Sequence, residues 1–159
     1  MKHYEAIHMP LVRYCDSRSY GLMDTEDLVQ ETVLRTLEGY ESIREQSRLL
    51  SYMIGMANNI CRNVQRSLGR QRKHLGEVGR RLYISPAQPD QITEIELLYE
   101  KISELGNDER EAILMFEVSG FAIKEVAEAL DRSEGATKTL LSRARGKLRS
   151  LMISNFEQV

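Results

Sequence analysis

Apolar residues recur at the three- and four-residue spacing of an amphipathic helix along almost the whole sequence. In the clearest case Val29, Val33 and Leu37 form one stripe, and Asp24 or Thr25 stands where a helix cap is expected. The β-branched clusters bounded by hairpin turns that are typical of sheets do not occur in the sequence. The chain is therefore predicted to be all-α.

A break in this pattern divides the chain. Helical periodicity fails after Gly69, and Pro86 and Pro89 stand in the polar segment 85–90. We therefore expect two small helical domains, at residues 1–68 and 91–159, joined by a flexible linker at residues 69–90. The first domain should contain helices at residues 4–14, at 25–38 ending at Gly39, and from Ser47 onward. The second should contain helices at residues 95–105, 107–119, 123–130 and 133–151.

The net charge is only −2, so the case for a nucleic-acid partner depends on where the basic residues lie. Basic residues concentrate in residues 58–81 and 132–149, each of which contains a single acidic residue. Acidic residues concentrate in residues 24–45 and 90–100. This segregation predicts two nucleic-acid contacts and at least one surface for a different partner.

Residues 120–151 have the proportions of a helix-turn-helix. Ala127 is small enough for close helix approach, residues 131–133 form the turn, and Ser133 is suited to cap the second helix. The second helix of such a motif lies in the major groove of duplex DNA. The alternative is a plain helical hairpin with a solvated basic face. If Thr137, Leu141, Ala144 and Leu148 pack inward, the outward residues are Lys138, Ser142, Arg145 and Arg149, with Arg143 beside them.

The third helix carries an unusual polar side. Its aromatic ring, amides and guanidinium groups suit unpaired bases, because a ring stacks on a base while arginines hold phosphates. Taken alone, the aromatic residue also fits a half-buried surface position. The residues concerned are Tyr52, Asn59, Arg62, Asn63 and Arg66. On the second helix Asp27, Gln30 and Glu31 form a polar cluster away from the apolar stripe, for which a merely solvated surface is the alternative.

No arrangement of residues indicates an enzyme, a metal site or a cofactor. The three histidines lack a nucleophile or carboxylate partner motif, and no glycine-rich phosphate loop occurs. Cys15 and Cys61 lack the spacing of zinc ligands and are expected to be buried as small hydrophobic residues. No apolar run indicates a signal peptide or a membrane span, so a cytoplasmic protein without membrane insertion is expected.

The order of these features resembles a known family. Residues 24–34, with the sequence DTEDLVQETVL, resemble region 2.2 of bacterial sigma-70 factors, especially of the extracytoplasmic-function (ECF) subgroup. Residues 52–59 are similar to the family segment in which an aromatic residue leads to Ala-x-Asn, here Ala57 to Asn59. Residues 120–145 are similar to region 4.2. The resemblance covers essentially the whole chain.

The resemblance implies a transcription initiation factor that binds core RNA polymerase and promoter DNA. By position, Asp27, Gln30 and Glu31 would contact the polymerase clamp helices. The polar side of the third helix, including Tyr52, would open and hold the minus-ten element. Many members of the family are also held inactive by an anti-sigma factor. The minus-thirty-five element would be contacted as duplex by Lys138, Ser142, Arg143 and Arg145.

Some positions depart from the family pattern. Tyr52 replaces a frequent tryptophan, and Met56 a common isoleucine, so both keep bulk. Asp131 stands where glycine often forms the turn, and Asp tolerates a left-handed conformation better than most residues. Glu134 repels phosphate and Ala136 lacks a hydroxyl, so duplex affinity or promoter choice is expected to differ.

Two other classes of protein fit part of the sequence. A stand-alone helix-turn-helix regulator would bind duplex DNA tightly as a dimer without polymerase, but it leaves the polar sides of the second and third helices unexplained. A sigma-like antagonist is suggested by the modest charge and by Glu134, and it would bind polymerase without supporting transcription.

Overall fold

The structure, a computed structural model, describes residues 2–83 and 93–157, and every regular element in these ranges is helical. The all-α prediction is therefore confirmed for the described residues. The first domain contains α1 (Lys2–Ser19), α2 (Thr25–Glu38), the short 3-10 turns η1 (Tyr40–Ser42) and η2 (Gln46–Arg48), and α3 (Leu49–Tyr83). The second contains α4 (Glu94–Ser103), α5 (Asn107–Ile113), the π turn η4 (Leu114–Val118), α6 (Ile123–Ala129) and α7 (Glu134–Glu157).

The first domain is a three-helix bundle. Its core is built from Leu11, Leu28, Met53 and Ala57, and both cysteines are buried, Cys15 and Cys61 alike, as predicted. The α2 helix begins and ends where local signals place it. The Asp24 carboxylate accepts a hydrogen bond from the Asp27 backbone N–H at 3.1 Å, and the Gly39 backbone N–H closes the last turn.

The first helix is longer than the predicted residues 4–14, since α1 runs from Lys2 to Ser19. Its last turn carries the polar residues Ser17, Arg18 and Ser19, which are all buried. Buried polar residues interrupt the apolar pattern on which the prediction depended, so the sequence alone did not reveal this turn.

The third helix also extends beyond its prediction. It does not end at Gly69 but continues to Tyr83, so its last turns occupy part of the predicted linker at residues 69–90. The side chains of residues 69–73 are exposed, and a helix that leaves its bundle needs no apolar stripe. Arginine, glutamine and lysine are good helix formers there. The rest of the predicted linker, with Pro86 and Pro89, lies outside the described residues.

The second domain contains the predicted helix-turn-helix. The turn between α6 and α7 contains Asp131 in the left-handed conformation, with φ 53°. Ser133 caps α7, because its Oγ accepts a hydrogen bond from the Ala136 backbone N–H at 3.1 Å. Thr137, Leu141 and Ala144 are buried, as the helical pattern predicts.

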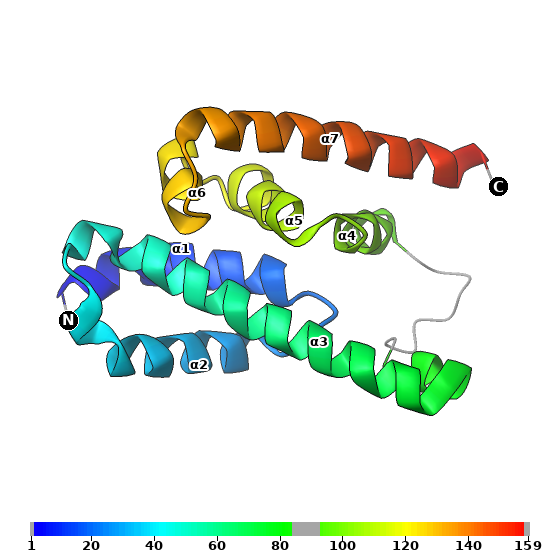
Figure 1. Cartoon of the computed structure of the whole chain (residues 1–159), viewed down its shortest axis with the longest axis horizontal. Helices are drawn as coiled ribbons and strands as arrows, with labels where there is room; N and C mark the ends of the chain where they lie inside the picture. The colour runs from blue at the N-terminus through cyan, green and yellow to red at the C-terminus, as the bar shows by residue number, and fades with distance from the viewer. Residues whose placement is uncertain (1, 84–92, 158–159) are drawn as a thin grey trace.

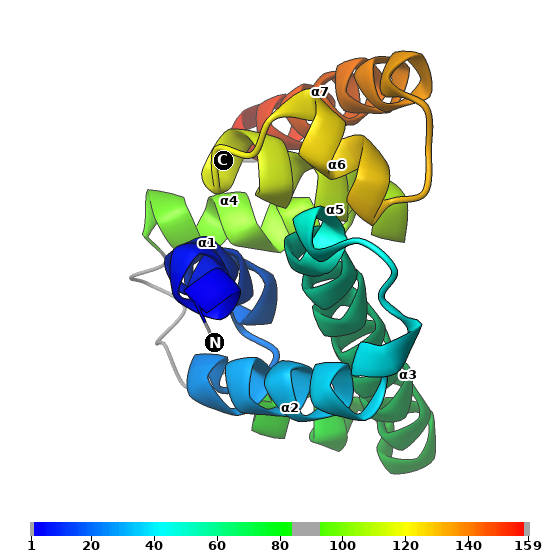
Figure 2. The same cartoon turned by 90° about the vertical axis from the view of Figure 1, so that its left-hand side faces the viewer.

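The two domains pack directly against each other. In Figures 1 and 2, α4 to α7 lie on the side of α1 and α3, whereas α2 lies on the opposite side of the first domain. One buried cluster joins them, because Tyr14 and Ile54 of the first domain pack with Phe121 and Leu141 of the second. Two faces of the first domain therefore meet different surroundings: the α2 face meets solvent and the α1–α3 face meets the second domain.

Candidate nucleic-acid interface

The polar cluster of α2 is open to solvent. Asp27 and Gln30 are exposed, and Glu31 is half-exposed because its carboxylate pairs with Arg35 at 2.7 Å on the same helix. The main contacts of α2 are with α1, α3 and η1, and Figures 1 and 2 show α2 on the side of the first domain that faces away from the second. All three predicted residues lie within two turns of one helix.

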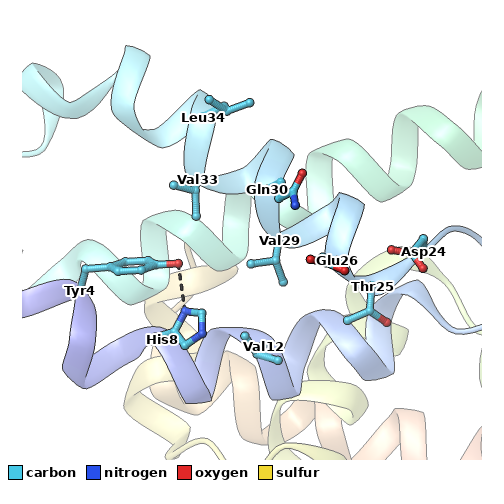
Figure 3. A pocket seen from close by; sticks show the side chains of 10 residues that line it. All are labelled: Tyr4, His8, Val12, Asp24, Thr25, Glu26, Val29, Gln30, Val33 and Leu34. Carbon is cyan, nitrogen blue, oxygen red and sulfur yellow. Dashed lines mark hydrogen bonds between the residues drawn. The ribbon is translucent and has the colours of Figure 1, made fainter.

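A groove of about 780 Å³ lies beside this cluster, between α1 and α2 (Figure 3). Val29, Val33 and Gln30 line it from α2, and a hydrogen bond of 3.0 Å joins Tyr4 Oη to His8 Nδ1 on α1. This groove was not predicted. The α1 residues that line it could not be recognised from the sequence, because the apolar pattern of that helix is irregular.

The predicted single-strand face on α3 is only partly assembled. Asn59, Asn63 and Arg66 are exposed along the helix, and Arg66 Nη1 donates to Asn63 Oδ1 at 3.4 Å. Tyr52 is half-buried in a hollow between α3 and the second domain. A Cβ at Gly39 would approach the Tyr52 hydroxyl to 2.6 Å, so the absence of a side chain at Gly39 makes room for this ring.

Arg62 points elsewhere. Its Nε donates to Glu111 Oε1 at 2.8 Å, and its Nη2 donates to Glu111 Oε2 at 2.6 Å and to Asp108 Oδ1 at 3.0 Å. Both carboxylates belong to α5 of the second domain, and the hydrogen bonds to Glu111 raise the pKa of Arg62 above its usual value. The structure therefore separates Arg62 from the other predicted single-strand residues.

Further basic residues extend the α3 face. Arg70 and Lys73 line a shallow hollow of about 510 Å³ together with Asn63 and Arg66. These residues were missed as site candidates because the helix was expected to end at Gly69. The signal was present in the basic block at residues 58–81, which continues past that glycine.

The predicted duplex-binding residues of α7 are all exposed: Lys138, Ser142, Arg143 and Arg145. They differ in their partners. Arg145 Nε pairs with Glu117 Oε1 at 2.5 Å, and its guanidinium lies 5.5 Å from the centre of the Phe116 ring. In residues 2–83 and 93–157 no ion pair is found for Lys138 or Arg143, so these two present their charge most directly.

Metal-binding clusters and membrane-spanning helices are both absent from the described part of the chain. There, no group of three or more His, Cys, Asp or Glu side chains is arranged to hold a metal ion. A membrane crossing would need a long apolar helix, and none of the described helices meets that requirement.

Comparison with known proteins accounts for both domains. Residues 3–71 match the family description Sigma-70 region 2, and residues 95–148 match Sigma-70, region 4. The ECF RNA polymerase sigma factor EcfG of Rhodopseudomonas palustris is 30% identical over 128 residues, which cover 80% of this chain and 70% of EcfG. The chain belongs to the ECF subgroup of the sigma-70 family. This membership confirms the resemblance found in the sequence.

Other relatives agree with this membership. The ECF sigma factor SigG of Mycobacterium tuberculosis is 29% identical over 94% of this chain, which spans only 47% of SigG. A structure of the sigma factor RpoE in complex with the anti-sigma factor NepR from Bartonella quintana has a TM-score of 0.64 and 23% identity. That match covers 93% of this chain and 94% of RpoE, so the two chains share a fold.

The two family matches coincide with the two helical domains of the chain. The region 2 match contains α1, α2 and most of α3, and the region 4 match contains nearly all of α4 and most of α7. The polar clusters of α2 and α3 therefore belong to region 2, and the basic side of α7 belongs to region 4. The Arg62–Glu111 contact joins the two regions.

Proposed function

We propose that this chain initiates transcription by binding core RNA polymerase through α2 and promoter DNA through α3 and α7. The observation that carries the proposal is the separation of three polar surfaces on three helices, within two domains that match sigma regions 2 and 4 in order. A regulator that only binds duplex DNA has no use for the first two surfaces.

The α2 surface has the composition of a protein-binding site. Asp27 and Gln30 lie near the exposed apolar residues Leu34 and Leu37, which are 58% and 64% accessible. Large exposed apolar side chains rimmed by polar ones are typical of sites for a protein partner. The adjoining groove between α1 and α2 offers further apolar area. Core polymerase is the partner that the family membership favours.

The α3 surface suits a single strand. Tyr52 supplies a ring for stacking, Asn59 and Asn63 supply amide donors and acceptors, and Arg66 supplies a phosphate contact. We propose that these residues hold the opened minus-ten element. On α7, Lys138, Ser142, Arg143 and Arg145 face the minus-thirty-five duplex, where arginine and lysine contact guanine edges or phosphates.

Transcription from fragmented genomic DNA of the source organism, with purified core polymerase and sequencing of the new 5′ ends, tests the proposal. Wild type should produce discrete start sites. Asp27→Ala/Gln30→Ala should lose co-purification with core but keep duplex binding, whereas Glu38→Ala, an exposed change on the same helix, should alter neither.

The α3 surface needs its own comparison. Asn59→Ala/Arg66→Ala should keep core binding and lose start sites, whereas Ser67→Ala, exposed one residue further on, should support normal transcription. A wild-type protein that fails to bind core would refute the proposal. Core binding without any transcript would instead favour a polymerase antagonist.

An anti-sigma factor is a second proposed partner. RpoE was crystallised with NepR, and this chain shares its fold. Purification from the source organism should recover a second protein that competes with core polymerase for the chain. Recovery of polymerase alone would contradict this part of the proposal.

A further inference from the structure

The α3 helix lines a second hollow, on the side that faces the second domain. Five residues that lie three or four positions apart share this side of the helix: Arg62, Gln65, Arg66, Gly69 and Arg72. The hollow has a volume of about 490 Å³ and is lined by residues of both domains. The turn after α1 contributes residues 20–22, and the end of α4 with the start of α5 contributes Ser103, Asn107 and Arg110.

The hollow contains an excess of positive charge. Four arginines line it, and no acidic residue of the described ranges does. Arg62 pairs with Glu111 and Asp108, but these bonds use only its Nε and Nη2. For the other three arginines, Arg66, Arg72 and Arg110, no ion pair is found in residues 2–83 and 93–157. The described residues therefore supply no carboxylate that neutralises these three charges.

Arg110 is held in place by neutral acceptors. Its Nη2 donates to the backbone oxygen of Ser103 and, at 3.0 Å, to that of Leu105, and its Nη1 donates to Asn107 Oδ1 at 3.5 Å. These bonds fix the guanidinium where α4 meets α5 but leave its charge uncompensated. Burial and the nearby charge of Arg18 lower the pKa of Arg110 below its usual value, as expected where the potential is positive.

This chemistry suits a ligand with phosphate groups. A guanidinium presents forked donors that match two phosphate oxygens at once. The amide nitrogens of Gln65 and Asn107 form no hydrogen bond with a described residue, so they add two neutral donors. The volume falls within the range of small-ligand sites, which is about 300–1,000 Å³. Because the lining comes from four segments of the chain, the hollow encloses a compact group rather than following an extended strand.

We propose that this hollow binds a compact polyphosphate, either inorganic or as part of a nucleotide. Arg66 and Arg72 of α3 bind its oxygens from the first domain, while Arg110 supplies charge and Asn107 an amide donor from the second. A single phosphate would meet fewer of these groups than a chain of phosphates does. The proposal does not depend on the promoter-binding roles proposed for α3 and α7, although the polyphosphate and a single strand share Arg66.

Calorimetric titration of the full chain with sodium tripolyphosphate, in about 150 mM salt, tests the proposal. Binding should saturate at one ligand per chain. Gln65→Glu keeps the size of the side chain and places a negative charge in the hollow, so affinity should fall about tenfold or more. Arg72→Gln, at an exposed position, removes one phosphate contact and should weaken binding about fivefold.

Two variants on the same helix are matched controls. Gln71→Glu repeats the chemical change of Gln65→Glu, and Arg70→Gln repeats that of Arg72→Gln, but neither control residue lines the hollow. The Debye length at this salt is about 8 Å, so both controls should bind within about twofold of wild type. Equal weakening by test and control variants would indicate general attraction to a basic helix and would overturn the proposal. The absence of saturable binding would overturn it too.

Thermal unfolding provides a second readout. A ligand that binds only the folded chain raises its melting temperature. Tripolyphosphate should therefore raise the melting temperature of wild type and of both controls, and should raise that of Gln65→Glu much less. The melt without ligand shows whether Gln65→Glu folds, and Arg72→Gln provides the same comparison at an exposed site. An equal rise in wild type and Arg72→Gln would contradict the proposed site.

Two other ligands distinguish the possible sources of the phosphate groups. ATP carries the same triphosphate and should lose affinity in the same variants. Binding of ATP without binding of tripolyphosphate would overturn the proposal, because the base would then provide the affinity. A labelled mixed-sequence single strand tests whether the hollow belongs to the path of the strand instead. Gln65→Glu should change strand affinity by less than about threefold, and an equal loss for strand and tripolyphosphate would overturn the proposal.

Failure of the proposed strand function gives a different result. Wild type would then bind no single strand, while its affinity for tripolyphosphate would still depend on Gln65 and Arg72.

Discussion

The basic side of α7 presents less charge than its sequence suggests. Arg145 pairs with Glu117 at 2.5 Å and Lys147 with Glu109 at 2.6 Å, whereas no such pair is found for Lys138 or Arg143 in the part of the chain that the structure describes. We therefore expect Lys138 and Arg143 to provide the main phosphate contacts of region 4. Glu117 should weaken duplex binding by holding Arg145.

The size of each effect follows from counterion release. Each phosphate contact contributes about 0.9 to the slope of log affinity against log salt. Lys138→Ala/Arg143→Ala should therefore reduce the magnitude of the slope by about 1.8. When salt rises from about 50 to about 200 mM, the variant should then lose roughly 12-fold less affinity than wild type. Glu117→Gln should increase the slope by up to about 0.9 and tighten binding by up to about fivefold, because an exposed ion pair contributes about 0–1 kcal/mol.

Fluorescence anisotropy with a short labelled duplex measures these slopes, and no promoter needs to be known because phosphate contacts are independent of sequence. Arg13→Ala, an exposed change on α1, is the control for loss of one positive charge and should leave the slope unchanged. The reasoning is refuted if Lys138→Ala/Arg143→Ala keeps the wild-type slope, or if Glu117→Gln weakens binding.

Three further predictions concern the fold. Tyr14→Phe should lower the free energy of unfolding by about 1–3 kcal/mol in urea denaturation, because the buried Asn58 Oδ1 loses its hydroxyl donor; an unchanged midpoint would contradict this. Asp131→Gly should match or exceed wild-type stability, whereas Asp131→Val should lose about 1–2 kcal/mol at this left-handed position; equal melting temperatures for the two variants would argue against strain there. Burial raises the pKa of the Cys15 thiol to about 12 in the folded protein. The protonated thiol therefore contributes its full stability below the unfolded-state pKa of about 8.5, and this contribution is lost as the pH rises through the folded-state pKa. Wild type should therefore lose more stability than Cys15→Ala as the pH rises above about 8.5, and parallel losses would refute this assignment.

Features set by neighbouring residues in the chain could be predicted from the sequence. The Asp24 cap, the Ser133 cap and the helix end at Gly39 depend on groups within four residues, and the structure has all three. The inward side of α7 was also predictable, because a single apolar stripe of that helix packs against one neighbouring surface.

Features set by distant residues could not be predicted. Glu111 lies in the charged run at residues 108–111, which has the pattern of a solvated first turn, yet it is fully buried. Its partners Arg18 and Arg62 are 93 and 49 residues away in the chain. No spacing rule connects residues so far apart, so these ion pairs were visible only in three dimensions.

The number of buried sides on a helix explains which surfaces were predicted well. A helical pattern divides residues into one inner and one outer side, and in α2 it located the exposed polar cluster. The buried residues of α2 are nevertheless Leu28, Thr32 and Thr36, and Leu37 of the predicted stripe is 64% exposed. By contrast, α1 buries Leu11 in the core of the first domain and Tyr14 in the core shared with the second. In α3, Met53 and Ile54 divide in the same way. A second buried side makes the apolar pattern of α1 irregular. On α3, it places Arg62 between the two domains, although the pattern predicts that Arg62 points outward. Arg62 therefore lies in the interface between the two domains, whereas Asp27 and Gln30 of the α2 polar cluster stay exposed.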